Sequence, residues 1–151
     1  MGPAPARGPD ATAYRSPERQ GRPVNRAHFI LYVHDPRRAR AFYSRALGIE
    51  PSLDVPGMTE FGLPGGAVLG LMPETGIRRL LGAALPDPAL AAGVPRAELY
   101  LVVDGAEEYH RRALEAGGRE LSAPAPRDWG HRAGYVLDPD GHVLAFAEEL
   151  T

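Results

Sequence analysis

Two stretches decide the fold: His28-Phe29-Ile30-Leu31-Tyr32-Val33 and, at an offset of 70 positions, Glu98-Leu99-Tyr100-Leu101-Val102-Val103. Both are rich in aromatic and β-branched residues, which favour strands. A stretch with apolar residues at three- and four-residue spacing follows each of them, as expected for a helix packed on a sheet. Within these helices, residues 43–47 (YSRAL) match residues 109–114 (YHRRAL) with one insertion. The sequence therefore predicts an internal repeat.

The ends of the predicted elements have recognisable signals. Asp35-Pro36 suits an N-cap followed by proline at the first helical position, and Gly48 suits the residue that ends the same helix. Pro64-Gly65-Gly66 lies between two short strand-like runs, which predicts a hairpin. Asp104 is the expected N-cap of the second helix.

Three more strands are expected in the second half of the chain, near 119–122, 132–137 and 142–148. Asp138-Pro139-Asp140-Gly141 lies between the last two and has the composition of a β-turn. Each half of the chain thus has the order βαβββ.

The expected organisation is one domain preceded by a tail. Residues 1–24 contain almost no large aliphatic side chain, and such a segment cannot bury enough apolar surface to order itself. We therefore expect a disordered tail over 1–24 and a single domain over 25–150. Within the domain we expect module one at 26–73, a connecting helix and linker at 74–95, and module two at 96–150.

Composition excludes several classes of function. The chain has no cysteine, so disulfides, thiolate metal sites and cysteine catalysis are ruled out. The formal net charge of −2 is no footprint of a nucleic-acid or membrane-surface protein. No apolar run approaches the ~20 residues of a membrane span, and the N-terminus lacks the apolar core of a signal peptide. We expect a cytoplasmic protein with neither nucleic acid nor membrane as a partner.

Residues 28–35 (HFILYVHD) and 41–48 (AFYSRALG) resemble the first strand and the helix end of the vicinal-oxygen-chelate superfamily. Residues 129–132 (WGHR) and 138–142 (DPDGH) resemble its closing hairpin. The superfamily includes glyoxalase I, extradiol dioxygenases, fosfomycin-resistance enzymes and bleomycin-resistance proteins. The resemblance extends over 26–150 and implies an α+β fold, in which two βαβββ modules form an incomplete β-barrel around a cavity with the helices packed outside.

Strand alternation indicates which side chains should face that cavity. The more apolar faces, Phe29/Leu31/Val33 and Leu99/Leu101/Val103, are expected to pack under the helices, so the opposite faces should line the cavity. His28 and Glu98 are the polar exceptions there, at equivalent points of the repeat. Aromatic side chains at the cavity or its mouth favour flat ligands, and an arginine there would suit an anionic group. The candidate ligand-binding residues are His28, Tyr32, Glu98, Tyr100, Trp129, Arg132 and Tyr135.

The resemblance also implies four metal-ligand positions, which fall on His28, Gly70, Glu98 and Ala145. Gly70 and Ala145 have no donor atom, and a catalytic divalent ion usually has three or more protein ligands. We therefore predict no metal and no other cofactor. Glu60 is a candidate replacement for a missing ligand, approaching the site from a neighbouring strand. His131 and His142 lie near strand ends, where we expect them to face solvent or cap a loop.

The resulting functional hypothesis is metal-independent binding of a small molecule, such as an antibiotic or aromatic metabolite, in the manner of bleomycin-resistance proteins. We expect a homodimer, the commonest assembly of soluble oligomers. The alternative is a lyase, isomerase or dioxygenase with an atypical metal set centred on His28 and Glu98. A third class is a dimerisation module whose cavity is filled by its own side chains.

Overall fold

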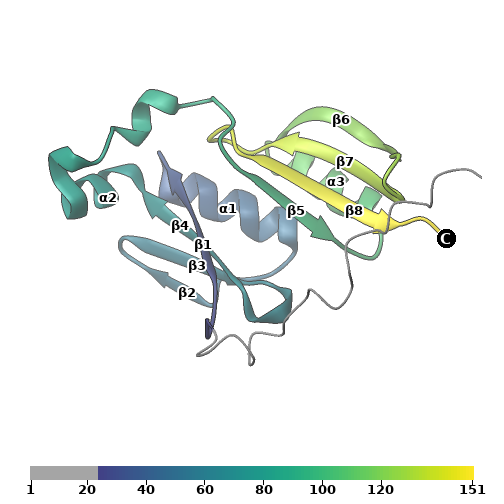
Figure 1. Ribbon diagram of the computed structural model, residues 1–151, viewed down its shortest axis with the longest axis horizontal. Coiled ribbons are helices and arrows are strands. Elements are labelled where there is room, and N and C mark those ends of the chain that lie inside the picture. The colour runs from purple at the N-terminus through teal and green to yellow at the C-terminus, as the bar shows by residue number, and fades with distance from the viewer. Residues whose placement is uncertain (1–23) are drawn as a thin grey trace, which may run out of the picture.

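The computed structural model describes residues 24–151 and contains two four-stranded sheets (Figure 1). Sheet one has the order β1-β4-β3-β2. Its strands are β1 (His28–Val33), β2 (Leu53–Val55), β3 (Met58–Gly62) and β4 (Val68–Pro73). β1 runs parallel to β4, and the other pairs are antiparallel. Residues 1–23, which make up nearly all of the predicted tail, lie outside the described residues.

Sheet two repeats this arrangement with the order β5-β8-β7-β6. Its strands are β5 (Glu98–Val102), β6 (Arg119–Pro126), β7 (His131–Leu137) and β8 (Val143–Glu149). β5 and β8 are parallel, as β1 and β4 are in sheet one. The prediction of an α+β fold of two βαβββ modules is confirmed: residues 24–151 form two open sheets and no closed barrel. β1 and β5, the strands that begin the two modules, each lie at the edge of their sheet.

Helix α1 (Pro36–Leu47) begins and ends where the sequence predicts. The side chain of Asp35 accepts hydrogen bonds from the backbone N–H groups of Arg37 and Arg38. Gly48 ends the helix in the left-handed conformation, with φ of 71°, and its N–H donates to Ser44 O. Glycine adopts this conformation without the steric cost that a Cβ brings.

Helix α3 (Ala106–Glu115) begins one residue later than predicted, so the assignment of Asp104 as its N-cap is wrong. The cap is Gly105, which has a φ of 78° that favours glycine over aspartate. The N–H of Gly105 donates to Glu148 Oε2 at 3.2 Å. A side chain from β8 therefore holds the start of this helix, in place of a local cap.

A shorter helix, α2 (Glu74–Leu81), follows β4. Two 3₁₀ turns, at Gly82–Ala84 and Pro88–Ala91, then lead to β5. Among the helices of residues 24–151, none has the length and apolar character needed to cross a membrane.

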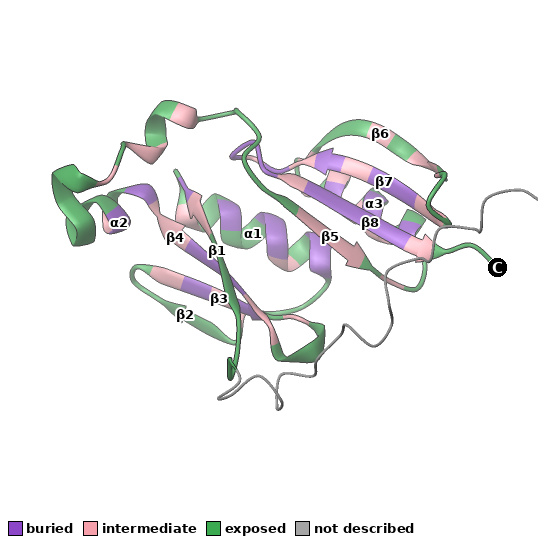
Figure 2. Ribbon diagram, viewed as in Figure 1, coloured by how far each residue is buried: buried purple, intermediate pink, exposed green. Residues whose placement is uncertain are grey.

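The core lies where α1 and α3 contact each other and the helix-facing sides of the two sheets. Leu69 and Leu71 of sheet one and Leu144 and Phe146 of sheet two are fully buried there, as strand alternation predicts. Figure 2 shows β8 largely buried and the short edge strand β2 exposed. Phe29 differs from the expectation, since it is 57% exposed. It lies on the edge strand β1, which has a neighbouring strand on one side only.

The turn between β7 and β8, in module two, contacts module one through hydrogen bonds. Asp138 Oδ1 accepts from the N–H groups of Asp140 and His142, which closes the predicted turn. Asp140 Oδ1 accepts from the backbone N–H of His34, and His142 Nε2 lies 3.2 Å from Tyr32 O. The expectation that His142 faces solvent or caps a loop is wrong: the side chain is buried, because the turn is folded against module one.

Candidate functional site

The outer face of each sheet, opposite the helices, has the polar and aromatic residues that the sequence analysis selected. On sheet two the register places Tyr100 of β5, Ala145 of β8 and Tyr135 of β7 side by side. Residues adjacent in such a row point to the same side of the sheet. The two tyrosines therefore lie on one face, separated by a single methyl group.

Tyr100 is the centre of a hydrogen-bonded aromatic group. Its hydroxyl lies 2.6 Å from His131 Nδ1, and the indole Nε1–H of Trp129 donates to the same oxygen at 2.9 Å. Because the indole can only donate, the Tyr100 oxygen accepts from it, and the Tyr100 O–H is left to donate to His131 Nδ1. The Tyr100 and His131 rings are stacked, with centroids 5.8 Å apart and planes at 22°. Together with Tyr135 we call these residues the aromatic cluster.

Tyr135 is held at the cluster by Arg127. The guanidinium carbon of Arg127 lies 5.4 Å from the centre of the Tyr135 ring, within the range of a cation–π interaction. Arg127 is itself fixed by Ser122 Oγ at 2.8 Å and by Ala133 O. Burial raises the pKa of Tyr135, and the nearby Glu98 raises it further. The Tyr135 hydroxyl therefore stays neutral and able to donate.

Three fully buried alanines, Ala133, Ala145 and Ala147, form the floor beneath these rings. Each contributes only a methyl group, so large side chains can lie across the sheet. Trp129 is 52% exposed although its indole N–H is bonded. The arrangement presents fixed aromatic surface to the solvent, and such surface suits stacking against a flat ligand.

The outer face of sheet one contains His28 and Tyr32. His28 Nδ1 lies 3.2 Å from Glu60 Oε2 of β3, so the Glu60 side chain reaches His28 across the intervening strand β4. Arg26 Nε donates to His28 Nε2 at 3.1 Å. Both nitrogens of the His28 ring are thus engaged, and His28 does not pair with Glu98, which belongs to the other sheet.

The four positions that the superfamily resemblance assigns to a metal do not fit one in this chain. A Cβ on Gly70 would lie 3.2 Å from Ile30 Cγ1 and from Met58 Sδ, so packed apolar atoms occupy the space of a ligand. Ala145 is fully buried and has no donor atom. Residues 24–151 contain no group of three or more His, Asp or Glu side chains placed to hold an ion.

The structure brings some of the candidate residues together and separates others. Glu98, Tyr100, Trp129 and Tyr135 gather on the outer face of sheet two. His28 and Tyr32 lie on sheet one. Arg132 points to the helix side of β7, where it pairs with Glu107 of α3. The Arg132 guanidinium is therefore engaged in an ion pair within module two, away from the outer face.

Sequence reasoning left His131 and Arg127 out of the candidate residues. It expected His131 to face solvent or cap a loop, whereas the side chain is half-buried and bonded to the Tyr100 hydroxyl. His131 is two residues before Ala133 and four before Tyr135, so alternation along β7 would place it on the same face. That signal was available in the sequence. Arg127 precedes β7 in a loop, where no periodicity applies, and only the structure shows its contacts with Ser122 and Tyr135.

A family model described as Glyoxalase/Bleomycin resistance protein/Dioxygenase superfamily matches residues 25–146. A solved glyoxalase-related enzyme from Fulvimarina pelagi is 24% identical, with 82% of this chain and 86% of that chain covered and a TM-score of 0.69. A glyoxalase/bleomycin resistance protein/dioxygenase from Nocardioides is also 24% identical, with 82% of each chain covered and a TM-score of 0.66. A family enzyme from Burkholderia phytofirmans PsJN is 19% identical, with 82% and 98% covered and a TM-score of 0.70. No protein of curated function matches the chain.

Proposed function

Because the chain belongs to the glyoxalase/bleomycin resistance protein/dioxygenase superfamily, we propose that it binds a flat, conjugated small molecule, an antibiotic or aromatic metabolite, without a metal ion. The observation that carries this proposal is the aromatic cluster on sheet two, where Trp129 is held by the Tyr100 hydroxyl and remains half exposed. The ligand stacks on the indole and on the Tyr135 ring.

Preorganisation favours binding at this cluster. A side chain that is immobilised only on binding loses conformational entropy, at a cost of about 0.5–1.5 kcal/mol. Trp129 is already oriented by its hydrogen bond to Tyr100, which in turn is fixed by His131. The aromatic surface therefore needs little further ordering when a ligand arrives.

We further propose that two copies of the chain assemble with the outer face of sheet one on the aromatic cluster of the other copy. In one chain each outer face lies opposite the helices, and exposed apolar side chains such as Ile30 and Val102 lie on these faces. A closed twofold dimer of this kind creates two equivalent sites. Tyr32 and His28 of one copy then complete the site formed by Glu98 and Tyr135 of the other.

Tryptophan fluorescence offers a direct test, because Trp129 is the only tryptophan in the chain. Bleomycin and a panel of conjugated antibiotics and metabolites are titrated against the protein, and both emission and melting temperature are followed. A ligand of the native state quenches the emission and raises the melting temperature.

Calorimetric titration of variants then locates the site. Trp129→Ala is expected to weaken a ligand found in this way at least tenfold. Leu90→Ala, at an 86% exposed position away from the cluster, serves as the control and leaves the affinity unchanged. The proposal fails if no compound of the panel binds, or if Trp129→Ala binds as tightly as the unaltered protein.

A further inference from the structure

Four arginine side chains from the two long helices line one hollow beside α1. The hollow has a volume of about 1000 Å³ and is open to solvent. Arg37, Arg40 and Arg45 come from α1, and Arg112 comes from α3. Residues 48–50, which follow α1, form part of the wall. We call this space the arginine hollow.

The periodicity of α1 explains why its surface is hollowed here. Ala41, Ser44 and Gly48 recur at intervals of three and four residues, so they lie on one side of the helix. All three are small, and they form a floor that extends over seven residues, about 10 Å at 1.5 Å per residue. The long side chains of the α1 arginines rise around this floor. Small residues in the middle and arginines around them therefore produce a depression that is lined by positive charge.

Gly48 admits the fourth arginine to the hollow. A Cβ at position 48 would lie 2.8 Å from Nη1 of Arg112, so the guanidinium packs against the end of α1 only because this residue is glycine. The guanidinium carbon of Arg112 also lies 5.0 Å from the centre of the Tyr109 ring, within the range of a cation–π interaction. Arg112 is thus held in place from both helices.

The ion pairs of these arginines leave most of their donors available. The three pairs are Arg40 Nε–Asp54 Oδ2 at 3.2 Å, Arg45 Nη2–Glu115 Oε2 at 3.4 Å and Arg112 Nε–Glu108 Oε1 at 3.5 Å. Each pair engages one of the three nitrogens of the guanidinium. All three carboxylates are exposed, and surface pairs of this kind contribute little free energy. Stronger acceptors can therefore bind the remaining nitrogens.

The lining itself has a strong excess of positive charge. Among the described residues that line the hollow, Glu50 is the only acidic one, so four arginines and one glutamate give a formal charge of +3. Two of the carboxylates outside the lining, Glu108 and Glu115, are also bound by Arg111 on the exposed side of α3. Their charge is thus shared with an arginine that lies outside the hollow.

From this arrangement we infer that the arginine hollow binds a small molecule with two or more linked phosphate groups. A guanidinium group binds two phosphate oxygens at once through parallel N–H groups. A terminal phosphate has a charge of about −1.5 to −2 at pH 7 and three strong acceptor oxygens. A formal charge of +3 and a floor about 10 Å long therefore suit several linked phosphates better than a single one.

The surroundings of the hollow favour a compact ligand over a long polyanion. Asp54, Glu108 and Glu115 lie around the arginines, and their carboxylates would repel a nucleic acid or an acidic segment that extends past the hollow. The site is also independent of the proposed binding of flat ligands, because the aromatic cluster lies on the face of sheet two opposite the helices.

The test uses sodium tripolyphosphate and inorganic phosphate as probes with the full-length protein. Calorimetric titration at pH 7.5 and about 0.1 M salt, without divalent metal ions, should show one tripolyphosphate bound per chain. Its affinity should be at least tenfold higher than that of inorganic phosphate. Absence of tripolyphosphate binding overturns the inference, as does equal affinity for both probes.

Two double variants locate the site. Arg37→Gln/Arg40→Gln removes two lining charges and should weaken tripolyphosphate binding at least tenfold. Arg78→Gln/Arg79→Gln, in α2 and outside the lining, is the matched control and should bind within twofold of the unaltered protein. In each double variant one arginine has a carboxylate partner and the other has none among the described residues. Equal weakening in both would show general charge attraction and contradict the site.

A third variant predicts a gain of binding, which a folding defect cannot imitate. Glu50→Gln removes the acidic residue of the lining and should strengthen tripolyphosphate binding at least threefold. Unchanged or weaker binding would count against the inference. Hexaglutamate provides the comparison with an acidic peptide: if it binds more tightly than tripolyphosphate, the hollow takes a peptide and the inference is wrong.

Discussion

The hydroxyl of Tyr43, in α1 of module one, donates a 2.5 Å hydrogen bond to Oδ2 of Asp138, in the β7–β8 turn of module two. Both residues are buried. Because Asp138 Oδ1 already accepts from two backbone N–H groups of the turn, this bond engages the second oxygen of the carboxylate. It joins residues 95 positions apart and is the best-buried polar contact between the modules.

Tyr43→Phe should lower the free energy of unfolding by about 1–3 kcal/mol, because it leaves Asp138 Oδ2 buried without a donor. Urea unfolding at neutral pH measures this cost. Tyr32→Phe, on the outer face of sheet one, is a suitable control and should change stability by less than about 0.5 kcal/mol. Equal stability of Tyr43→Phe and the unaltered protein would contradict the role assigned to the bond.

The difference in unfolding free energy between the unaltered protein and Tyr43→Phe should depend on pH. Burial raises the pKa of Tyr43 well above its usual value of 10.0, and the charge of Asp138 raises it further. Below about pH 10 the hydroxyl is neutral in both states and its contribution is complete. Above this pH the Tyr43 hydroxyl ionises in the unfolded chain before it ionises in the folded protein. The stability that Tyr43 adds over phenylalanine should therefore shrink by about 1.4 kcal/mol per pH unit. Urea melts of both proteins at about pH 8 and pH 11 test this, because the stability difference should be smaller at pH 11.

Gly134→Ala should destabilise the protein by about 1–3 kcal/mol through overpacking. A Cβ at this position would lie 2.6 Å from His110 Nδ1 and 2.9 Å from Pro124 Cγ. Gly62→Ala is the matched control, since a Cβ there meets no atom within 4 Å and the residue also lies in a strand. Denaturant melts of the two variants should therefore diverge, and similar midpoints would contradict the packing argument.

Ile30→Glu should convert the proposed dimer to a monomer. Ile30 is 42% exposed on the outer face of sheet one, so the charge is tolerated in a single chain but not in an apolar interface. Sedimentation velocity at tens of micromolar should give twice the chain mass for the unaltered protein and the chain mass for the variant. Leu90→Glu, which is 86% exposed and distant from this face, should remain dimeric.

The protein should purify without a stoichiometric divalent ion, and EDTA should leave its melting temperature unchanged. The reason is the donor set: Gly70 and Ala145 offer no ligand atom, and both nitrogens of His28 are engaged by Arg26 and Glu60. Elemental analysis of chelator-free protein checks the first statement. One tightly bound ion per chain, whose removal lowers the melting temperature, would disprove the prediction.

Glu98→Ala should change the free energy of unfolding by less than about 0.5 kcal/mol, because Glu98 is exposed on the outer face of β5. Leu144→Ala, at a fully buried position of the neighbouring strand, should cost about 2–5 kcal/mol. Leu101, which the sequence places in the core, is only partly buried and is a weaker reference. Denaturant melts that show equal losses for Glu98→Ala and Leu144→Ala would place Glu98 in the core.

Much of the fold could be predicted because its signals are local or periodic. Asp35 and Gly48 mark the ends of α1 through backbone chemistry that depends on a few neighbouring residues. The alternation in β5 separates Tyr100 from Leu99, and the offset of 70 positions reveals the second module. These features are sufficient to indicate the family from the sequence, and the family match over 25–146 confirms it.

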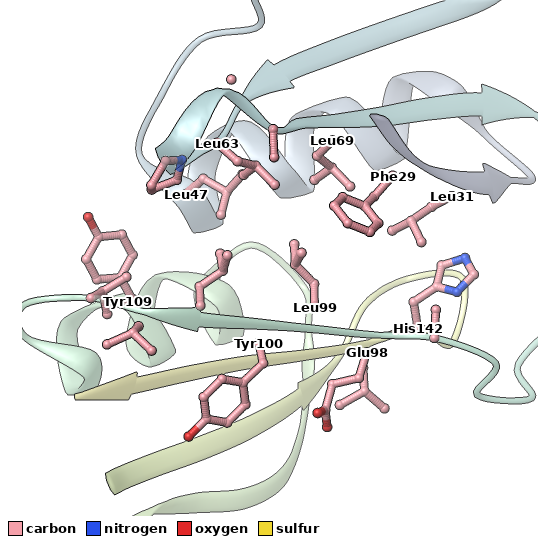
Figure 3. A pocket seen from close by; sticks show the side chains of 18 of the residues that line it. Phe29, Leu31, Leu47, Leu63, Leu69, Glu98, Leu99, Tyr100, Tyr109 and His142 are labelled. Atoms are coloured by element: carbon pink, nitrogen blue, oxygen red, sulfur yellow. The ribbon is translucent and has the colours of Figure 1, made fainter. Parts of the chain in front are cut away.

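The remaining features depend on contacts between distant segments. No periodicity applies to His142 at the end of a turn, and its burial follows from packing against Tyr32, 110 positions earlier. Alternation shows that Phe29 and Leu99 belong to apolar faces. It cannot show whether a helix packs on each face or whether the face lines an open groove. Part of the predicted helix-packing surface, including Phe29 and Leu99, therefore proves to line an apolar groove between β1 and β5 (Figure 3).

The bond between Tyr43 and Asp138 also distinguishes two modules that otherwise repeat each other. Tyr109 is the counterpart of Tyr43 in the repeat, yet its ring packs on Phe146 at 5.2 Å, and the module-one turn at Pro64-Gly65-Gly66 has no carboxylate to receive it. The link therefore runs in one direction only. A circular permutant that retains it should fold, whereas a chain made of two copies of module one would lack Asp138 and with it the bond. Since the duplication that the repeat implies, the halves have ceased to be interchangeable.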